Sequence, residues 1–136
     1  MKLALAVDER GRPLAVATAA ANQAEVKVAP EVLDAIPSEV PAGTPVVADR
    51  GYDSDPLRAE AAKRGLVLVA PHRRGRVRPK TADGRRLRRY RRRWIVERTI
   101  AWLQAFRRVE TRREYYSFIY HGFVMLACIL IVWRRS

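Results

Sequence analysis

The chain has 136 residues, enough for one domain with a real hydrophobic core, and it carries a formal net charge of +13. So large a positive charge indicates a polyanionic partner, either a nucleic acid or an anionic membrane surface. One cysteine and two histidines exclude a disulfide framework and a Cys/His zinc site, and no signal peptide is present, so we expect a cytoplasmic protein.

The first predicted element is a β-hairpin formed by Lys2 to Val7 and Leu14 to Thr18. Gly11 supplies the positive φ that a tight connection between these two runs requires. Pro30 to Ile36 follows as a short helix, with its proline in the first turn, where a missing N–H is tolerated.

A βαβ unit is predicted next. Thr44 to Ala48 and Leu66 to Ala70 are brief apolar strands. The helix between them begins at a cap provided by Ser54 or Asp55 and ends before Gly65, a typical C-terminal glycine. Two strands joined by a helix are expected to lie parallel, with a right-handed crossover.

A strongly basic region follows, with twelve Lys or Arg and one acid from residue 73 to residue 93. Residues 72–86 lack periodicity and are predicted to form a loop, and a long helix is predicted over Leu87 to Arg107. Phe118 to Trp133 is predicted to be a buried core helix. Its sixteen residues are fewer than the roughly 20 that a membrane span needs, so membrane contact is the less favoured interpretation.

The predicted long helix places four polar residues on one face. Tyr90, Arg93, Glu97 and Gln104 are separated by three, four and seven residues and span roughly a 60° arc. A lone carboxylate between an aromatic ring and a guanidinium suits an acid that binds metal beside a phosphate backbone. The alternative is an ordinary i,i+4 ion pair between Arg93 and Glu97.

Asp49 directly follows the first strand of the βαβ unit, and ligands bind at the carboxyl ends of strands in open α/β sheets. Gly51 would let the backbone turn sharply and expose this carboxylate. An acid on a helix, facing an acid at a strand end, can hold the divalent ions that two-metal nucleases use. The alternative for Asp49 is a loop residue that caps a turn. Asp53 and Asp55 are expected to be caps.

Two motifs carry a resemblance: Ala48-Asp49-Arg50-Gly51-Tyr52-Asp53 and, after it, Tyr90-x2-Arg93-x3-Glu97. In this order they resemble the C-terminal half of bacterial insertion-sequence transposases of the DDE type, and the likeness covers essentially the whole chain. The resemblance implies an α/β, ribonuclease-H-like fold with a mixed sheet and flanking helices. It also implies Mg²⁺-dependent DNA cleavage and strand transfer with two metal ions, in a nucleoid-associated protein.

By the same resemblance, Asp49 would be the second catalytic aspartate and Glu97 the closing glutamate, both of them metal ligands. Tyr90 and Arg93 match signature residues that contact DNA phosphates. Gln104 stands where the family signature has a lysine; it brings no charge, so its phosphate contact should be weaker. Three arginines beside the motifs are expected to contact DNA as well: Arg50, Arg89 and Arg92.

The family's first catalytic aspartate lies on a strand before the hairpin with which this chain begins. The resemblance therefore implies that residues 1–136 form one incomplete catalytic domain, truncated at the N-terminus. Asp8 could be a substitute, but within Asp-Glu-Arg-Gly an aspartate is an ordinary turn former. Glu25 stands near the place where the family motif after the hairpin often has an aspartate.

The sequence thus predicts the C-terminal fragment, or second reading frame, of a DDE transposase that is inactive alone. Its expected partners are DNA and either the N-terminal part of the transposase or a second copy of the chain, with no membrane. The alternative is a catalytically dead, basic DNA-binding remnant.

Overall fold

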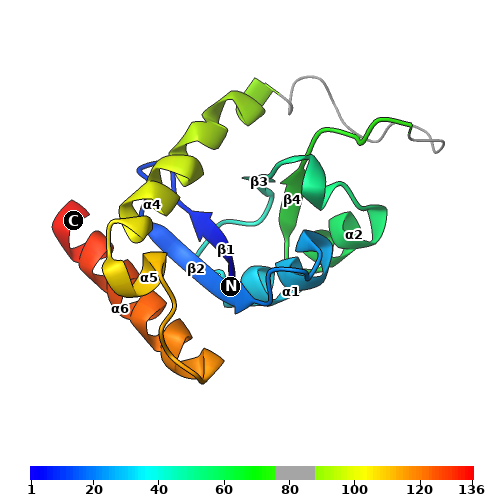
Figure 1. Cartoon of the computed structure of the whole chain (residues 1–136). Helices are drawn as coiled ribbons and strands as arrows, with labels where there is room; N and C mark the ends of the chain where they lie inside the picture. The colour runs from blue at the N-terminus through cyan, green and yellow to red at the C-terminus, as the bar shows by residue number, and fades with distance from the viewer. Residues whose placement is uncertain (76–87) are drawn as a thin grey trace.

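The computed structural model describes residues 1–75 and 88–136, except for the side chains of Arg89 and Tyr90. Most of the predicted loop at 72–86 therefore lies outside the described residues. The elements run in the following order (Figure 1): β1 (Lys2–Val7), β2 (Pro13–Ala19), α1 (Glu25–Ala35), β3 (Thr44–Val47), the 3₁₀ helix η1 (Arg50–Tyr52), α2 (Asp55–Lys63), β4 (Leu66–Val69), the 3₁₀ helix η2 (Arg88–Arg93), α4 (Trp94–Gln104), α5 (Arg107–Glu110) and α6 (Ser117–Arg135).

The predicted hairpin is confirmed: β1 and β2 pair antiparallel, from Lys2 opposite Ala19 to Val7 opposite Pro13. Gly11 has a φ of +83° in the connection, as expected. The Asp8 carboxylate accepts the backbone N–H of residues 10 and 12 and the Nε of Arg12. Its geometry is that of a turn former.

The predicted βαβ unit is also confirmed. Strands β3 and β4 are parallel, with Thr44 opposite Leu66 and Val47 opposite Val69. Ser54 caps α2 by accepting the N–H of Leu57, so the cap is Ser54 rather than Asp55. These signals were readable because each depends on residues only a few positions apart.

Helix α1 begins at Glu25, before the predicted start at Pro30, which lies inside the helix. Two faces of α1 are buried: Val28 and Val32 pack on the hairpin, whereas Ala29 and Leu33 pack on α2 and β4. Burial on both faces offsets the backbone hydrogen bond that an internal proline removes. Because of this double contact, α1 joins the two halves of the molecule (Figure 1).

The α/β class is confirmed, but the strands do not form the single mixed sheet that was expected. In the described ranges they form two separate two-stranded sheets, one antiparallel (β1–β2) and one parallel (β3–β4). Both sheets therefore have strand edges without a partner among the described residues.

The predicted helix from Leu87 to Arg107 is shorter in the structure. Residues 88–93 form the 3₁₀ helix η2, and α4 covers only Trp94–Gln104. Five arginines among six residues repel one another and also meet the positive end of the α4 dipole, which disfavours a longer α-helix. One face of α4 packs into the core, with Ile95, Thr99 and Leu103 buried.

Helix α4 is docked against the hairpin turn. The buried Thr99 hydroxyl donates to the carbonyl of Gly11 at 2.5 Å, and Arg98 donates to the carbonyl of Arg10. A Cβ on Gly11 would lie 2.8 Å from Thr99 Oγ1, so glycine is required here for close approach as well as for its φ. This contact sets where α4 lies.

Within the described residues, helix α6 packs by one face, so the expectation of a buried core helix holds for that face and not for the rest of the helix. Its buried side chains are Tyr120, Val124, Ala127, Cys128 and Ile131. Burial raises the pKa of the Cys128 thiol to about 11. By length and composition alone, Ser117–Arg135 could cross a membrane; among the described residues it is the one helix with this property.

Candidate active site

Asp49 lies just past the carboxyl end of β3, as the sequence predicted. The strand ends at Val47, and the N–H of Ala48 still donates to the carbonyl of Val69. Asp49 then caps η1, because its Oδ1 accepts the N–H of Gly51 at 2.9 Å. The strand-end position and the turn-capping alternative are thus both realised by the same residue.

A second carboxylate, Glu25, lies beside Asp49. A Cβ on Gly51 would be 3.0 Å from Asp49 Oδ1 and 3.4 Å from Glu25 Oε2, so the two acids flank one small space. Gly51 lies in the tight 3₁₀ turn that follows Asp49, and it does not have a positive φ. Its role is to leave room between the carboxylates.

The negative charges of Asp49 and Glu25 change the pKa of a neighbouring side chain, Tyr52. Burial raises the pKa of Tyr52, and the negative charges of Asp49 and Glu25 raise it further. Lys2 Nζ lies 3.1 Å from Glu25 Oε1. A hydrogen bond from its own backbone N–H, followed by that from Lys2, lowers the pKa of Glu25. Glu25 therefore remains ionised beside Asp49 near neutral pH.

Asp53, expected to be a cap, is instead a buried anchor whose side chain is only 5% exposed. Its carboxylate lies 2.7 Å from Arg58 Nη1 and 3.1 Å from His72 Nδ1, and it accepts the N–H of Arg73 at 2.6 Å. Burial alone would raise the pKa of Asp53, but these hydrogen bonds outweigh it and lower the pKa to about 2.

The same anchor fixes the backbone beside Asp49. The Arg73 side chain donates from Nε to the carbonyl of Arg50 and from Nη2 to that of Gly51. The segment 49–53 is therefore tied to the chain after β4. Sequence reasoning missed this brace, because His72 and Arg73 lie in a basic stretch without periodicity and their partners are about twenty residues away.

Glu97 lies on the exposed side of α4 and makes the ion pair that was considered as its alternative role. Arg93 Nε lies 2.9 Å from Glu97 Oε1, with side chains that are 37% and 53% exposed. The prediction that Tyr90 and Glu97 share one α-helix is wrong, because residue 90 belongs to η2 and the α-helix begins four residues later.

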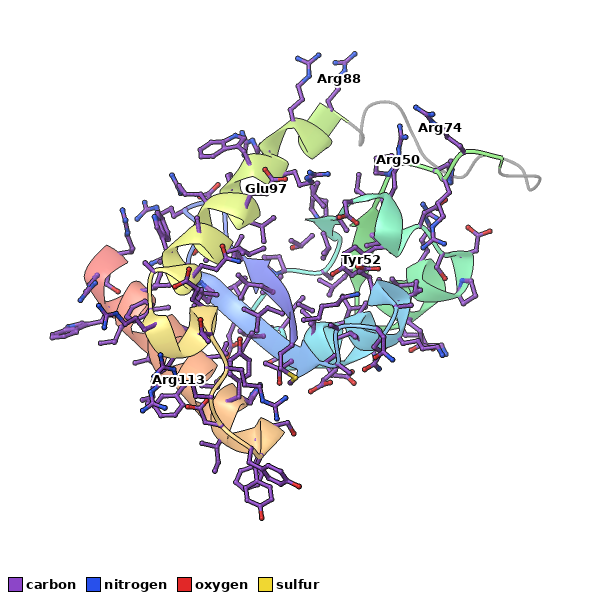
Figure 2. The ribbon with its side chains drawn as sticks, viewed as in Figure 1. Arg50, Tyr52, Arg74, Arg88, Glu97 and Arg113 are labelled. Carbon is purple, nitrogen blue, oxygen red and sulfur yellow. The ribbon has the colours of Figure 1, made fainter. Side chains whose placement is uncertain are left out.

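The other predicted DNA-binding residues are spread over three elements, η1, η2 and α4. Arg92 is exposed near the junction of η2 and α4, Gln104 is exposed at the end of α4, and Arg50 is exposed on η1. The side chains of Arg89 and Tyr90 lie outside the described part of the chain. Segment η2 packs against β3, and Figure 2 shows Arg50, Arg74 and Arg88 at the same end of the molecule. That end is a basic surface next to the carboxyl end of β3.

The donor atoms suit a hard divalent cation, since carboxylate oxygens are what Mg²⁺ prefers. In the ranges 1–75 and 88–136, however, no three His, Cys, Asp or Glu side chains gather closely enough to hold a metal ion. Asp49 and Glu97 are thus suitable ligands in kind, while a complete ligand set needs a further contribution.

Comparisons with known proteins agree with the motifs. The family described as "Transposase DDE domain" matches residues 1–132. The chain is 39% identical over 137 residues to a putative transposase for insertion sequence element IS402 of Burkholderia cepacia, covering 96% of this chain and 61% of that protein. No solved structure matches the chain.

Proposed function

Because the chain belongs to the Transposase DDE domain family, we propose that it forms part of the centre at which an insertion-sequence transposase cleaves and transfers DNA strands. The observation that carries this proposal is the family match over almost the whole chain, with Asp49 at the end of β3. DNA is the partner that this family implies. The basic surface formed by η1 and η2 supports DNA as the ligand.

Transposases of this family use divalent metal ions, and in the proposed centre Asp49 and Glu97 hold them, with Mg²⁺ as the physiological ion. Bound metal would stabilise the attacking and leaving oxygens of the phosphodiester. The chain's own contribution is positional. Hydrogen bonds from Arg73 hold the backbone beside Asp49, and the Thr99 contact with the hairpin turn sets the place of α4.

In this proposal the Arg93–Glu97 ion pair is a resting state. An exposed pair of this kind contributes little to stability, so it can open at little cost. Glu97 would then be available to hold a metal ion, and Arg93 to bind a phosphate oxygen of DNA. Arg50, Arg89, Arg92 and, more weakly, Gln104 contact the backbone around it, together with Tyr90.

We further propose that this chain lacks the first catalytic aspartate and is inactive alone. It spans 61% of the length of its insertion-sequence relative. In the part of the chain that the structure describes, both sheets have strand edges without a partner, which is consistent with a strand supplied by another part of the transposase. Two carboxylates cannot easily hold two divalent ions, so the missing aspartate would have to come with that strand.

The test is a nicking and strand-joining assay with the purified chain, Mg²⁺ or Mn²⁺, and labelled duplexes. We expect DNA binding that falls steeply with salt, and little or no cleavage. Mg²⁺-dependent nicking that Asp49→Ala abolishes would show that the chain is a complete enzyme and contradict the missing-aspartate proposal.

The alternative, a catalytically dead DNA-binding remnant, predicts DNA binding that does not respond to divalent ions. Under that alternative Glu97→Gln and a matched control on α5, Glu110→Gln, would behave alike in every metal concentration. A metal response lost in Glu97→Gln but kept in Glu110→Gln would favour the catalytic centre.

A further inference from the structure

The outer face of α6 carries a continuous stripe of exposed apolar side chains. Their exposed fractions are 71% for Phe118, 40% for Ile119, 42% for Met125, 57% for Leu126, 58% for Ile129 and 76% for Trp133. Residues 118, 122, 125, 126, 129 and 133 follow the three-to-four-residue spacing of one helix face. A patch of this size on a helix surface is characteristic of an interaction site.

This stripe is symmetric about the midpoint between Met125 and Leu126. Reversing the helix about that point places Phe118 opposite Trp133 and Gly122 opposite Ile129. Gly122 is a notch: a Cβ there would meet nothing within 4 Å. A bulky side chain, Ile129, therefore faces a gap, Gly122, at two symmetric positions on either side of the midpoint.

We propose that α6 is a homodimer interface, in which two copies of the chain pair their α6 helices antiparallel about a two-fold axis near Met125 and Leu126. Such an isologous contact requires a self-complementary patch, and the stripe is one. Ile129 of each copy fills the Gly122 notch of the other. The proposal does not depend on any chemistry at Asp49.

The size of the stripe fits this partner. At the exposures given above, six large side chains offer roughly 700 Å² per copy, close to the roughly 800 Å² per partner of a stable interface. The ends also complement each other. Antiparallel pairing brings the exposed Arg134 toward the aromatic end of the other helix, where Tyr115 and Tyr116 are 88% and 57% exposed.

A bilayer is a poorer occupant for this helix. The opposite face of α6 is committed to the core, where Val124 is fully buried, so the helix cannot be surrounded by lipid without unfolding the domain. In the described ranges α6 packs against β2, α4 and α5 (Figure 1), and its outer face points away from all three.

Analytical ultracentrifugation of the 136-residue chain over a concentration series tests the proposal. We expect a monomer–dimer equilibrium whose dissociation constant rises at least about 30-fold in Ile129→Glu, since a charge then enters the centre of the interface. Ala101→Glu introduces the same charge on the exposed side of α4 and should leave the dimer intact. A wild-type chain that stays monomeric at high micromolar concentration overturns the proposal.

A substitution at Gly122 distinguishes the specific antiparallel pairing from non-specific hydrophobic association. Gly122→Leu should raise the stability of the monomer, because glycine disfavours helix and the space around it is open. It should nevertheless weaken the dimer, because the added leucine side chain occupies the space that Ile129 of the other copy fills. Non-specific association, or binding to phosphatidylglycerol vesicles, would instead grow with the added apolar side chain, and that result contradicts the two-fold packing.

Disulfide cross-linking tests the register. Leu126→Cys lies at the proposed axis and should cross-link two copies on oxidation, whereas Phe118→Cys should not, because the two 118 positions would be roughly 20 Å apart along the helices. The native Cys128 is buried and should not interfere. Cross-linking through residue 118 in preference to 126 would refute the antiparallel arrangement.

Discussion

The segment from Asp49 to Asp53 and the outer face of α4 supply the two acids of the proposed centre, and they are held in different ways. Arg73, which lies outside the first segment, braces it by donating its backbone N–H to Asp53 and its side chain to the carbonyls of Arg50 and Gly51. Glu97, in contrast, is half-exposed and pairs with Arg93 one turn away. The backbone beside Asp49 is therefore fixed, whereas Glu97 is held only by an exposed ion pair. Substitutions in the two regions should accordingly affect different properties.

The largest effect is expected at the anchor of the braced segment. Asp53→Asn should lower the free energy of unfolding by about 3 kcal/mol, because it removes the buried charge that pairs with Arg58, next to the less buried Asp55, and that accepts hydrogen bonds from His72 and Arg73. Urea denaturation measures this. Glu60→Gln is the control: it removes a partly exposed carboxylate on α2, the helix that carries Arg58, and this carboxylate also pairs with an arginine, so the effect should be much smaller. Equal losses in the two variants would show that the Asp53 brace is unimportant.

A comparison of substitutions at two glycines measures the contribution of the contact between α4 and the hairpin turn. Gly11 and Gly43 both have a φ of +83°, but only Gly11 is crowded, because a Cβ added to it would lie 2.8 Å from Thr99 Oγ1. Gly43→Ala should cost about 1 kcal/mol for backbone strain, whereas Gly11→Ala should cost about 2–3 kcal/mol. Thermal or urea unfolding gives both values. If the two variants were equally stable, α4 would not depend on close approach to the hairpin turn.

The brace should also appear as a pH dependence. The pKa of Asp53 is about 2 in the folded chain and lies below its ordinary value of 3.8. The ionised Asp53 carboxylate therefore stabilises the folded chain by about 2 kcal/mol above about pH 5. This stabilisation is lost as the pH falls toward 2. The stability gap between the wild-type chain and Asp53→Asn should narrow by that amount as the pH falls from about 6 to about 2. A gap that stays constant over this range would mean that the pKa of Asp53 is not depressed.

The smallest effect on folding is expected on the exposed face of α4. Arg93→Gln should leave the free energy of unfolding nearly unchanged. The negative slope of log K for DNA binding against log salt should become shallower by about 1, because one phosphate contact is lost. Arg113→Gln, at the opposite end of the molecule in Figure 2, should leave the slope unchanged. Fluorescence anisotropy over a salt series compares them. Identical slopes for both variants would remove Arg93 from the DNA interface.

The elements that the sequence predicted are those with local signals. Gly11, Ser54 and Gly65 each mark a turn or helix end through neighbours only a few residues away, and the hairpin and the βαβ unit follow from them. The motifs around Asp49 and Glu97 also identified the family, which the comparisons confirm. The roles of these two acids stay a prediction.

What could not be predicted depends on contacts between distant residues. Nothing near Glu25 in the sequence indicates that it will lie beside Asp49, because that contact follows from how α1 packs on both sheets. The Asp53 brace is of the same kind. The start of the α-helix at Trp94 was not predicted, because the regular spacing of residues 90, 93, 97 and 104 favours one continuous helix. Repulsion among the adjacent arginines acts against that longer helix.

The most direct test of the proposed centre is a double-mutant cycle for Mn²⁺ binding, measured by electron paramagnetic resonance on the DNA-bound chain with Asp49→Asn, Glu97→Gln and the double variant. Ligands of one ion are coupled, so the double variant should lose little more affinity than either single variant. Losses that simply add, or that are no larger than in Glu110→Gln, would show that residues 49 and 97 do not share a metal site.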